Sequence, residues 1–431
     1  MQSTTITEER DLVLSEMAET LIGSEIIKLA AEVKLLIDKG EKIHNLTIGD
    51  FDPAVFPIPE ELESEIIEAY KAGHTNYPAA NGIGELRKAV SKFLTSNEGL
   101  EYHADQILIA AGSRPLIYAT YRTILDRGDK VIFPVPSWNN NHYCHLTDAE
   151  QIIVETKPEN NFMPSAQDLA PFVKDATMIA LCSPLNPTGT TFTREGLAEI
   201  CDLILEENNR RSPGEKPLYL MYDQIYWALT YGNTHHANPI ILRPEMRNYT
   251  ICIDGISKSF AATGVRVGWA FGPDRIINKM KAILSHVGAW SPKAEQVATA
   301  KFLEETEAVN TYLVSIREQL SERLSTIYNG IQQLKKEGFN VDSIAPQAAI
   351  YLTVKFSLHN YKTAEGKILN TTEDITKYLL QEAKLAIVPF YAFGASKESP
   401  WYRLSVGTVA MKEIDSLFHD LRVALSKLSK D

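Results

Sequence analysis

The sequence predicts an α/β fold in which a mostly parallel sheet is covered by helices on both faces. Two observations carry this prediction. Seven short apolar runs alternate with helical segments between residues 105 and 272, and the runs cover 107–110, 131–133, 152–154, 178–181, 219–222, 250–253 and 267–271. Because the runs are apolar on both faces, each is expected to be buried on both sides, which is typical of parallel strands flanked by helices.

The same pattern predicts a division into two domains, for which 431 residues are sufficient. We expect a large domain over 56–294 and a smaller α+β domain over 295–431 that residues 1–55 complete. A long helical stretch over 295–336, with a break near Gly330, is expected to connect them.

The composition is that of an ordinary globular enzyme, with 44% hydrophobic and 23% charged residues. The net charge of −12 and the lack of a basic tract argue against nucleic acid or an acidic membrane as the main partner. The four cysteines show no CxxC spacing and are expected to be free thiols in a reducing compartment. No apolar run is long enough to span a membrane, and residues 2–10 are polar, so a cytoplasmic protein is expected.

Chemically distinctive residues follow five of the seven predicted strands. In open α/β sheets, ligands bind beyond the carboxyl ends of the strands, so these residues are expected to share one site. They are Gly112, Ser113 and Arg114 after the first strand, Trp138 after the second, Asn186 after the fourth, Asp223 and Tyr226 after the fifth, and Ser257 and Lys258 after the sixth.

Two cations in this set stand among apolar and small residues, where an unpaired charge is costly. A lysine in such surroundings has a lowered pKa and becomes a usable amine nucleophile, which favours this role for Lys258. Arg266, eight positions later, can hold a phosphate through its planar guanidinium. The turn at Gly112 opens a helix whose first N–H groups can also bind a phosphate. A lysine that forms a Schiff base beside a phosphate site indicates pyridoxal phosphate. No metal site is expected, because His142 and His145 have no obvious third ligand.

Four motifs occur in a fixed order: Asn-Pro-Thr-Gly at 186–189, Asp-x-x-Tyr at 223–226, Ser-Lys-x-Phe followed by Gly-x-Arg-x-Gly over 257–268, and Tyr-Arg-Leu-Ser at 402–405. Together they resemble the class I/II aminotransferases, which depend on pyridoxal phosphate, have fold type I and are related to aspartate aminotransferase. The resemblance extends over nearly the whole chain, from Gly49 to Arg403. Each motif alone is weak, and the ordered set is specific.

The resemblance implies a role for each matching residue. Lys258 would form the aldimine with the cofactor, Asp223 would pair with the protonated ring nitrogen, Asn186 and Tyr226 would bind the phenolic oxygen, and Trp138 would stack on the ring. The phosphate would lie on Gly112, Ser113, Arg114 and Ser257, with Arg266 neutralising it. Arg403 would bind the substrate α-carboxylate, and Gly49 would line the same pocket. From the residues alone, Arg403 is as compatible with a structural carboxylate partner as with a ligand. Tyr77 would reach the phosphate of a neighbouring subunit, which implies a homodimer with shared sites.

The chain departs from the family pattern at several positions. Gly255 stands where family members often carry a serine that binds the phosphate, so Ser257 or a backbone N–H is expected to take over that contact. Gln224 follows Asp223 where an acid is frequent, and the loop at 346–348 lacks the frequent Pro-x-Gly. His286 stands where one aspartate-specific subgroup has an arginine, so it would bind a dicarboxylate side chain weakly or line a pocket for a polar or aromatic one.

The predicted function is a ping-pong transfer of an amino group from an L-amino acid to a 2-oxo acid, with aspartate or a related amino acid as the donor. Two alternatives stay open. The same cofactor residues would serve a lyase or a decarboxylase. A non-catalytic regulator with an aminotransferase-like domain is the more remote alternative. Such proteins carry a basic DNA-binding domain ahead of the fold, whereas this sequence has no basic tract.

Overall fold

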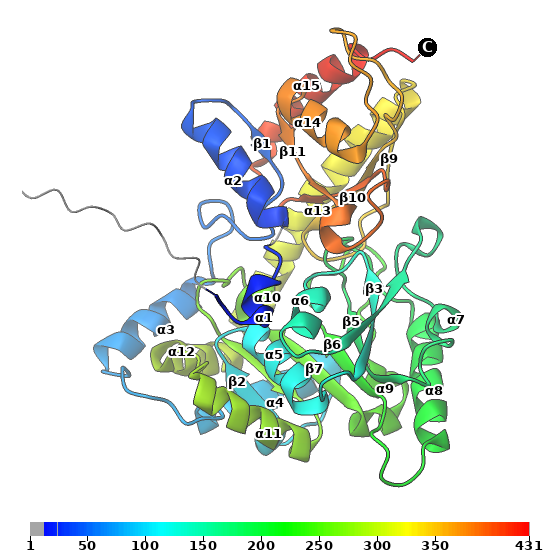
Figure 1. Cartoon of the computed structure of the whole chain (residues 1–431). Helices are drawn as coiled ribbons and strands as arrows, with labels where there is room; N and C mark the ends of the chain where they lie inside the picture. The colour runs from blue at the N-terminus through cyan, green and yellow to red at the C-terminus, as the bar shows by residue number, and fades with distance from the viewer. Residues whose placement is uncertain (1–12, 24, 431) are drawn as a thin grey trace, which may run out of the picture.

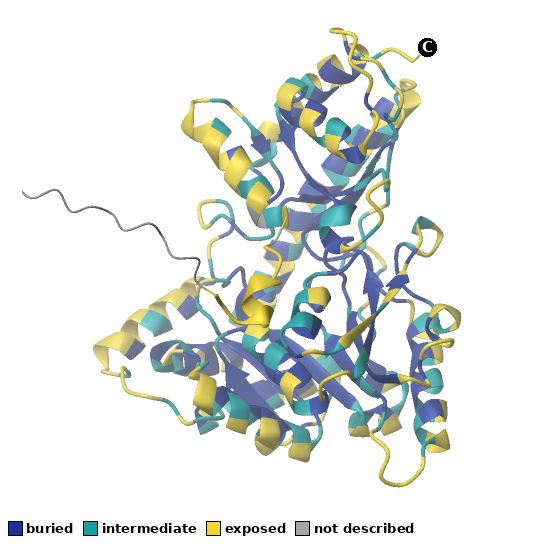
Figure 2. Ribbon diagram, viewed as in Figure 1, coloured by how far each residue is buried: buried dark blue, intermediate teal, exposed yellow. Residues whose placement is uncertain are grey.

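The computed structural model describes residues 13–23 and 25–430. Two lobes are visible in Figure 1. The lower lobe holds the large sheet and the helices α3 to α12, and the upper lobe holds α2 and the chain from α13 onward. Most of the large sheet is buried, whereas the short helix α1 (Glu16–Glu19) is exposed along its length (Figure 2).

The lower lobe is built on a seven-stranded sheet, and all seven predicted strands are present. The strands are β2 (Ile107–Ala110), β3 (Lys130–Val135), β4 (Glu150–Glu155), β5 (Ala176–Cys182), β6 (Tyr219–Asp223), β7 (Thr250–Gly255) and β8 (Gly268–Phe271). Their order is β2-β8-β7-β6-β5-β3-β4. β8 runs antiparallel to the other six strands, which share one direction, so the mostly parallel sheet is confirmed.

Helices cover both faces of this sheet, as the apolar strands require. Ile107 and Ile109 of β2 face a core formed with α4, α8 and α12, whereas Leu108 and Ala110 face a second core formed with α5, α6 and α11. The same alternation holds in the other central strands because successive side chains of a strand point to opposite faces. The helices are α3 (Glu60–Lys71), α4 (Gly84–Glu98), α5 (Ser113–Ile124), α6 (Asn140–His145), α7 (Ala166–Leu169), α8 (Arg194–Arg210), α9 (Pro239–Leu242), α10 (Ile256–Ser259), α11 (Asp274–Val287) and α12 (Lys293–Glu304), with 3₁₀ turns at Ala104–Gln106, Pro158–Asn160 and Pro244–Asn248.

The upper lobe combines an antiparallel sheet of order β12-β13-β10-β9 with the helices α2, α13, α14 and α15. A parallel pair of β1 and β11 attaches the N-terminal segment to this lobe. The elements are α2 (Glu25–Asp38), β1 (His44–Asn45), α13 (Thr306–Lys336), β9 (Val341–Ser343), β10 (Tyr351–Phe356), α14 (Thr372–Glu382), β11 (Leu385–Ala386), β12 (Val388–Pro389), β13 (Trp401–Ser405) and α15 (Ile414–Ser426), with 3₁₀ turns at Phe390–Phe393 and Met411–Glu413. The domain limits at 55/56 and 294/295 stay a prediction.

The long helical stretch is interrupted at a different residue from the expected one. Glu305 separates α12 from α13, and α13 continues through Gly330. The ring of Phe418 occupies the space beside Gly330, where a Cβ atom would lie 2.2 Å from it. The glycine therefore serves a close helix contact and does not end the helix.

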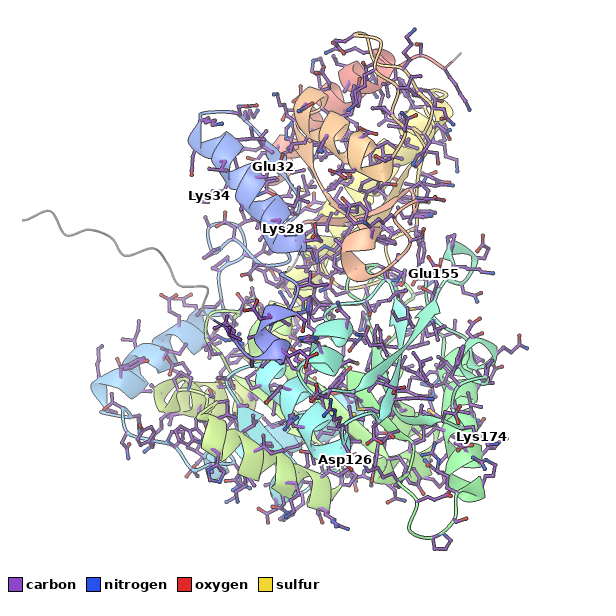
Figure 3. The ribbon with its side chains drawn as sticks, viewed as in Figure 1. Lys28, Glu32, Lys34, Asp126, Glu155 and Lys174 are labelled. Atoms are coloured by element: carbon purple, nitrogen blue, oxygen red, sulfur yellow. The ribbon has the colours of Figure 1, made fainter. Side chains whose placement is uncertain are left out.

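The two lobes also meet outside the sheets. Glu155, at the end of β4, lies on the side of the lower lobe that approaches the upper lobe (Figure 3). Its Oε1 accepts a hydrogen bond from the backbone N–H of Ser396, at 3.2 Å. Among the described residues, no helix is long and apolar enough to cross a membrane.

Candidate active site

The carboxyl ends of the central strands open into a cavity of about 570 Å³ between the lobes. Register places Cys182 beside Asp223, and Asp223 beside Ile253, so the loops after β5, β6 and β7 begin at the same edge of the sheet. The cavity brings together most of the residues predicted from the sequence: Gly49, Ser113, Arg114, Trp138, Asn186, Asp223, Tyr226, Ser257, Lys258, Arg266 and Arg403.

The start of α5 and Arg266 form a cationic corner of the cavity. Gly112 precedes α5 with φ of 86°, in the left-handed region that favours glycine. A Cβ atom there would lie 2.0 Å from Nη2 of Arg266, so the glycine also leaves the path of the guanidinium open. Arg266 donates through Nη2 to the carbonyl oxygen of Ala111, at 2.9 Å. The first N–H groups of α5 lack intrahelical acceptors, and this corner can therefore bind an anion.

Gly255 has a steric reason to replace the frequent serine. A Cβ atom at this position would lie 2.8 Å from Cα of Gly268 and from the carbonyl oxygen of Val267. Both are backbone atoms of the neighbouring chain segment, so a side chain here would force β7 and β8 apart. Ser257, two residues later, is buried and lines the cavity, and its expected contact with a phosphate stays a prediction.

Lys258, on the short helix α10, extends into the cavity. Its Nζ donates to the carbonyl oxygen of Gly49, at 2.6 Å. Burial lowers the pKa of Lys258 to about 8, and Arg403 and Arg114 act in the same direction. About a tenth of this amine is therefore unprotonated at pH 7, far more than for an ordinary lysine, and the unprotonated form is the nucleophile.

Asp223, the last residue of β6, presents a carboxyl group to the same cavity. Burial raises its pKa to about 6, opposed by one hydrogen bond from the backbone N–H of Ile225 at 3.1 Å. At neutral pH this carboxylate is ionised in an apolar setting with little compensation. It therefore favours a cationic or proton-donating ligand group.

Arg403 has no carboxylate partner among the ion pairs formed within residues 13–23 and 25–430, although its side chain is only 2% exposed. It donates through Nη1 to Oδ1 of Asn186, at 3.1 Å, and through Nη2 to the carbonyl oxygen of Thr47, at 2.6 Å. Both acceptors are neutral. Between the two alternatives for Arg403, this geometry favours an anionic ligand over a structural carboxylate.

Two aromatic residues complete the predicted set in the cavity. Trp138 lies beside Arg114, whose guanidinium carbon is 5.5 Å from the indole centroid. Tyr226 is 3% exposed, and its hydroxyl lies 2.7 Å from the hydroxyl of Tyr351. Trp138 offers a flat apolar surface and Tyr226 a hydroxyl to a bound ring.

Besides Gly112, which directly precedes the lining residue Ser113, two predicted residues do not line this cavity. Tyr77, in the loop between α3 and α4, is 80% exposed and packs edge-on against Trp290, with ring centroids 5.1 Å apart. His286 is exposed in the last turn of α11. A single chain does not test a contact across subunits, so the roles of Tyr77 and His286 stay predictions.

The cavity also contains residues that sequence reasoning did not select, above all Asp50 and Tyr351. Asp50 directly follows Gly49, and its carboxylate in a Gly/Asp/Pro turn was a signal that could have been used. Tyr351 stood in a predicted strand, and nothing local in the sequence distinguishes it from a core tyrosine.

The charges of the cavity define what it can bind. Four cationic side chains, Arg114, Lys258, Arg266 and Arg403, face two carboxylates, Asp50 and Asp223. The excess of positive charge favours an anionic ligand, and the buried carboxylate favours a ligand that also carries a proton or a positive charge. The described part of the chain contains no group of three or more metal-ligating side chains.

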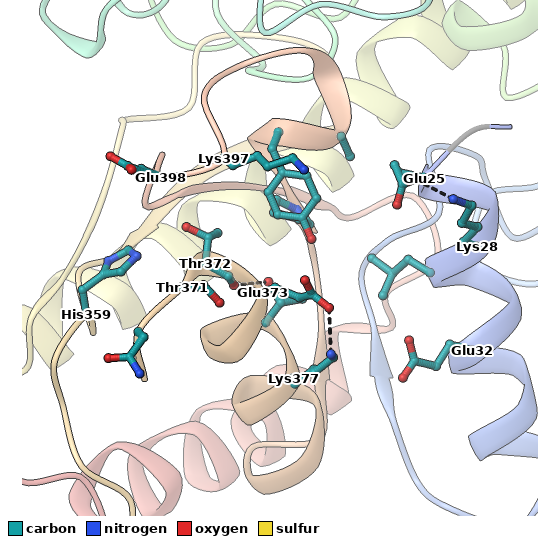
Figure 4. A pocket seen from close by; sticks show the side chains of 16 residues that line it. Glu25, Lys28, Glu32, His359, Thr371, Thr372, Glu373, Lys377, Lys397 and Glu398 are labelled. Atoms are coloured by element: carbon teal, nitrogen blue, oxygen red, sulfur yellow. Dashed lines mark hydrogen bonds and ion pairs between the residues drawn. The ribbon is translucent and has the colours of Figure 1, made fainter. Parts of the chain in front are cut away.

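A larger cavity of about 910 Å³ lies in the upper lobe between α2 and α14 (Figure 4). Two ion pairs form among its charged residues: Lys28 contacts Glu25 at 2.7 Å, and Lys377 contacts Glu373 at 2.7 Å. None of the residues predicted for catalysis or cofactor binding lines it. The chemistry therefore belongs to the smaller cavity between the lobes.

A buried lysine, a buried carboxylate and an anion-binding helix start lie together at the carboxyl edge of an α/β sheet, which is typical of a fold-type I enzyme with amine chemistry. The chain belongs to the family of class I and II aminotransferases, whose model matches residues 41–421. It is 29% identical over 385 residues to aspartate aminotransferase of Bacillus sp. (strain YM-2), covering 89% of this chain and 92% of the relative.

Solved structures support the same assignment. The aspartate aminotransferase from Rhizobium meliloti superposes with a TM-score of 0.87 at 25% identity, covering 97% of this chain and all of the other. The aspartate aminotransferase from Thermus thermophilus with maleate superposes with a TM-score of 0.84 at 25% identity, covering 96% of this chain and all of the other. The protein is a transaminase.

Proposed function

We propose that this transaminase uses pyridoxal phosphate and transfers the amino group of aspartate, or of a closely related L-amino acid, to a 2-oxo acid. The products are the matching 2-oxo acid and L-amino acid. The observation that carries the proposal is the convergence of Lys258, Asp223 and the cationic corner at Arg266 in one cavity.

The residues present fit this cofactor. The phosphate would lie on the start of α5, at Ser113 and Arg114, with Arg266 and Ser257 beside it, since these groups supply N–H, hydroxyl and guanidinium donors. Asp223 would hold the ring nitrogen in its protonated form, which accounts for a buried carboxylate with one neutral donor. When bound, the cofactor supplies an electron sink that stabilises negative charge developing at the substrate Cα.

Each remaining residue has a defined task in this proposal. Asn186 and Tyr226 bind the phenolic oxygen, and Trp138 covers the ring. Lys258 would hold the cofactor covalently until the substrate amine displaces it, and its freed amine would then remove the proton from the substrate Cα, for which an amine with a pKa of about 8 is suited. Arg403 binds the α-carboxylate through both terminal nitrogens, because its present partners are neutral oxygens.

The proposal of aspartate rests on the curated relatives, several of which carry the name aspartate aminotransferase. We further propose a homodimer with shared sites. Tyr77 is highly exposed and lies outside the cavity of its own chain, as a residue that serves a partner would. His286, exposed in the last turn of α11, would contribute to the side-chain pocket. A cytoplasmic location stays a prediction.

A half-reaction screen tests the proposal. The protein loaded with pyridoxal phosphate is mixed with single L-amino acids, and the visible absorbance is followed together with oxo acid release. Aspartate should convert the absorbance to that of the amine form of the cofactor and release one equivalent of oxo acid. Conversion by no amino acid would contradict the proposed function, and conversion only by non-acidic amino acids would contradict the substrate.

Loss of carbon dioxide, or release of ammonia without amine-form cofactor, would instead identify a decarboxylase or a lyase. Sedimentation of the loaded protein measures the subunit number, and a monomer at full activity would contradict the shared sites.

A further inference from the structure

Tyr351 connects the two lobes inside the active-site cavity. It begins β10 in the upper lobe and is 1% exposed. Its hydroxyl lies 2.7 Å from that of Tyr226, which follows β6 in the lower lobe. The two rings meet edge-on, with centroids 5.6 Å apart and an interplanar angle of 68°. This is a hydrogen bond of ordinary length between two buried phenols, and one of them is proposed to touch the cofactor.

The hydroxyl of Tyr351 also explains why residue 49 is a glycine. A Cβ atom on Gly49 would lie 2.8 Å from the Tyr351 oxygen and 3.4 Å from Nη1 of Arg403. A contact of 2.8 Å is shorter than real side chains allow, so an alanine at 49 would displace the hydroxyl. Gly49 therefore keeps Tyr351 within reach of Tyr226.

The ring of Tyr351 holds the arginine that is proposed to bind substrate. The guanidinium carbon of Arg403 lies 4.8 Å from the centroid of Tyr351 and 4.9 Å from that of Phe393. Two aromatic rings at this distance attract the cation and restrict its rotation. Tyr351 thus contacts both a residue assigned to the cofactor and a residue assigned to the substrate.

We propose that Tyr351 is a positioning residue of this site, an inference that rests on the function proposed above. Its hydroxyl donates to the oxygen of Tyr226, so the single proton of Tyr226 is directed to the phenolic oxygen of the cofactor. Its ring holds Arg403 in place for the substrate carboxylate. A phenol has one proton to donate and lone pairs to accept with, so both hydrogen bonds can exist together only in this direction.

Four other charged or titratable groups face the pair. Lys258 Nζ lies 5.9 Å from the centroid of Tyr226, and Arg403 lies over Tyr351. Asp50 and Cys182 line the same cavity. Substitutions of Tyr351 by phenylalanine and leucine alter none of these charges, which allows the hydroxyl and the ring to be tested separately.

The hydroxyl is tested by the pH dependence of the visible absorbance of the loaded protein. A hydrogen bond to the phenolic oxygen of the cofactor stabilises the anionic form of that oxygen. The nitrogen through which Lys258 would be joined to the cofactor then loses its proton at a lower pH. We therefore expect Tyr351→Phe to raise the midpoint pH of this absorbance titration by about half to one unit. A shift of this size corresponds to the free energy of one hydrogen bond. Tyr226→Phe should raise it further, and Tyr351→Phe should add nothing in the Tyr226→Phe background. Gly49→Ala should produce the same upward shift, because it displaces the hydroxyl and leaves Tyr351 present.

The ring is tested by the substrate KM. Tyr351→Phe keeps the ring and should leave KM within about twofold, whereas Tyr351→Leu should raise KM about tenfold through loss of the cation–π contact. Tyr402→Phe is the matched control, since that buried hydroxyl donates to the carbonyl oxygen of Thr372, at 3.3 Å, and its residue does not line the cavity. It should change neither the midpoint nor KM.

The outcomes separate this inference from the proposed function. The role of the hydroxyl would be overturned if the visible absorbance of the wild-type protein titrates with pH and the midpoint pH is unchanged in both Tyr351→Phe and Gly49→Ala. An equal shift in the wild-type and Tyr226→Phe backgrounds would do the same. An unchanged KM in Tyr351→Leu would overturn the role of the ring. A wild-type protein that acquires no visible band from pyridoxal phosphate would contradict the proposed function itself.

Discussion

Two buried polar regions meet at the dipeptide Asp223-Gln224. One region contains charged side chains, and in the other burial favours neutral side chains. Asp223 faces the cavity, where guanidinium groups and Lys258 remain charged or partly charged. Gln224 faces the opposite way, into a closed cluster that we name the Glu98 cluster: Glu98, Gln224, His236, Asn238 and Asp254.

The Glu98 cluster contains two carboxyl groups in apolar surroundings. Gln224 Nε2 donates to both oxygens of Glu98, at 2.9 and 2.8 Å. Burial raises the pKa of Glu98 to about 8, and burial together with the charge of Glu98 raises the pKa of Asp254. Burial also lowers the pKa of His236 to about 3. Burial thus favours the neutral forms of the titratable groups in the Glu98 cluster. In the cavity, by contrast, charged groups remain that can bind a ligand.

The largest expected effect is at Lys258. Lys258→Ala should lower kcat by at least about 10⁴-fold, because the covalent anchor and the proton carrier are lost together. Steady-state transamination of aspartate and 2-oxoglutarate measures it, and Lys279→Ala on the exposed side of α11 is the control. Activity within tenfold of the wild type would rule out this role.

The second largest effect is expected from a substitution of Arg403. Arg403→Lys should raise the KM of carboxylate substrates about 10- to 100-fold with little change in cofactor affinity, because an ammonium group cannot form the two parallel hydrogen bonds. The comparison is with Arg323, another buried arginine, which donates to the carbonyl oxygen of Val409 at 2.8 Å. Arg323→Lys should lower the melting temperature and leave KM unchanged. Equal KM values for both variants would show that Arg403 is structural.

Arg266 should have a smaller effect, confined to the phosphate. Arg266→Lys should weaken binding of pyridoxal phosphate about tenfold, because one point charge replaces a planar fork. Titration of the apoprotein by absorbance measures this affinity. Pyridoxal, which has no phosphate, is the internal control and should bind both proteins alike. A parallel loss for the two ligands would place Arg266 outside the phosphate site.

The Glu98 cluster gives the smallest effect and acts on stability alone. The pKa of Glu98 is about 8 in the folded protein and 4.5 as the ordinary value, so the folded state binds the extra proton between these values. The resulting stability is complete below pH 4.5 and is lost as the pH rises through about 8. Glu98→Gln should therefore reduce the fall in unfolding free energy between about pH 5 and 8 by about 3 to 4 kcal/mol, since each pH unit in this window contributes up to about 1.4 kcal/mol.

Denaturant unfolding of the apoprotein at several pH values measures this slope, with the exposed Glu101→Gln as control. The two variants should have equal kcat at neutral pH. Parallel curves for Glu98→Gln and the wild type would show that Glu98 is ionised in the folded state.

The sequence was sufficient for the strands and for the residues that follow them, since apolar runs and strand-end positions are local patterns. It placed Lys258, Asp223 and Arg403 in separate segments, and the structure brings them into one cavity. Contacts between distant segments could not be predicted in this way. The hydroxyl contact of Tyr226 with Tyr351 is one example, and the pairing of Gln224 with Glu98 is another. The reason for Gly255 likewise depends on how closely Gly268 approaches it.

Reductive labelling tests the central claim most directly. The protein is incubated with pyridoxal phosphate, treated with borohydride, digested, and the labelled peptide is identified by mass spectrometry. The account predicts one label per chain, on Lys258, and its loss when Arg266 is changed and the cofactor is limiting. A label distributed over surface lysines, or on a single lysine other than Lys258, would contradict it.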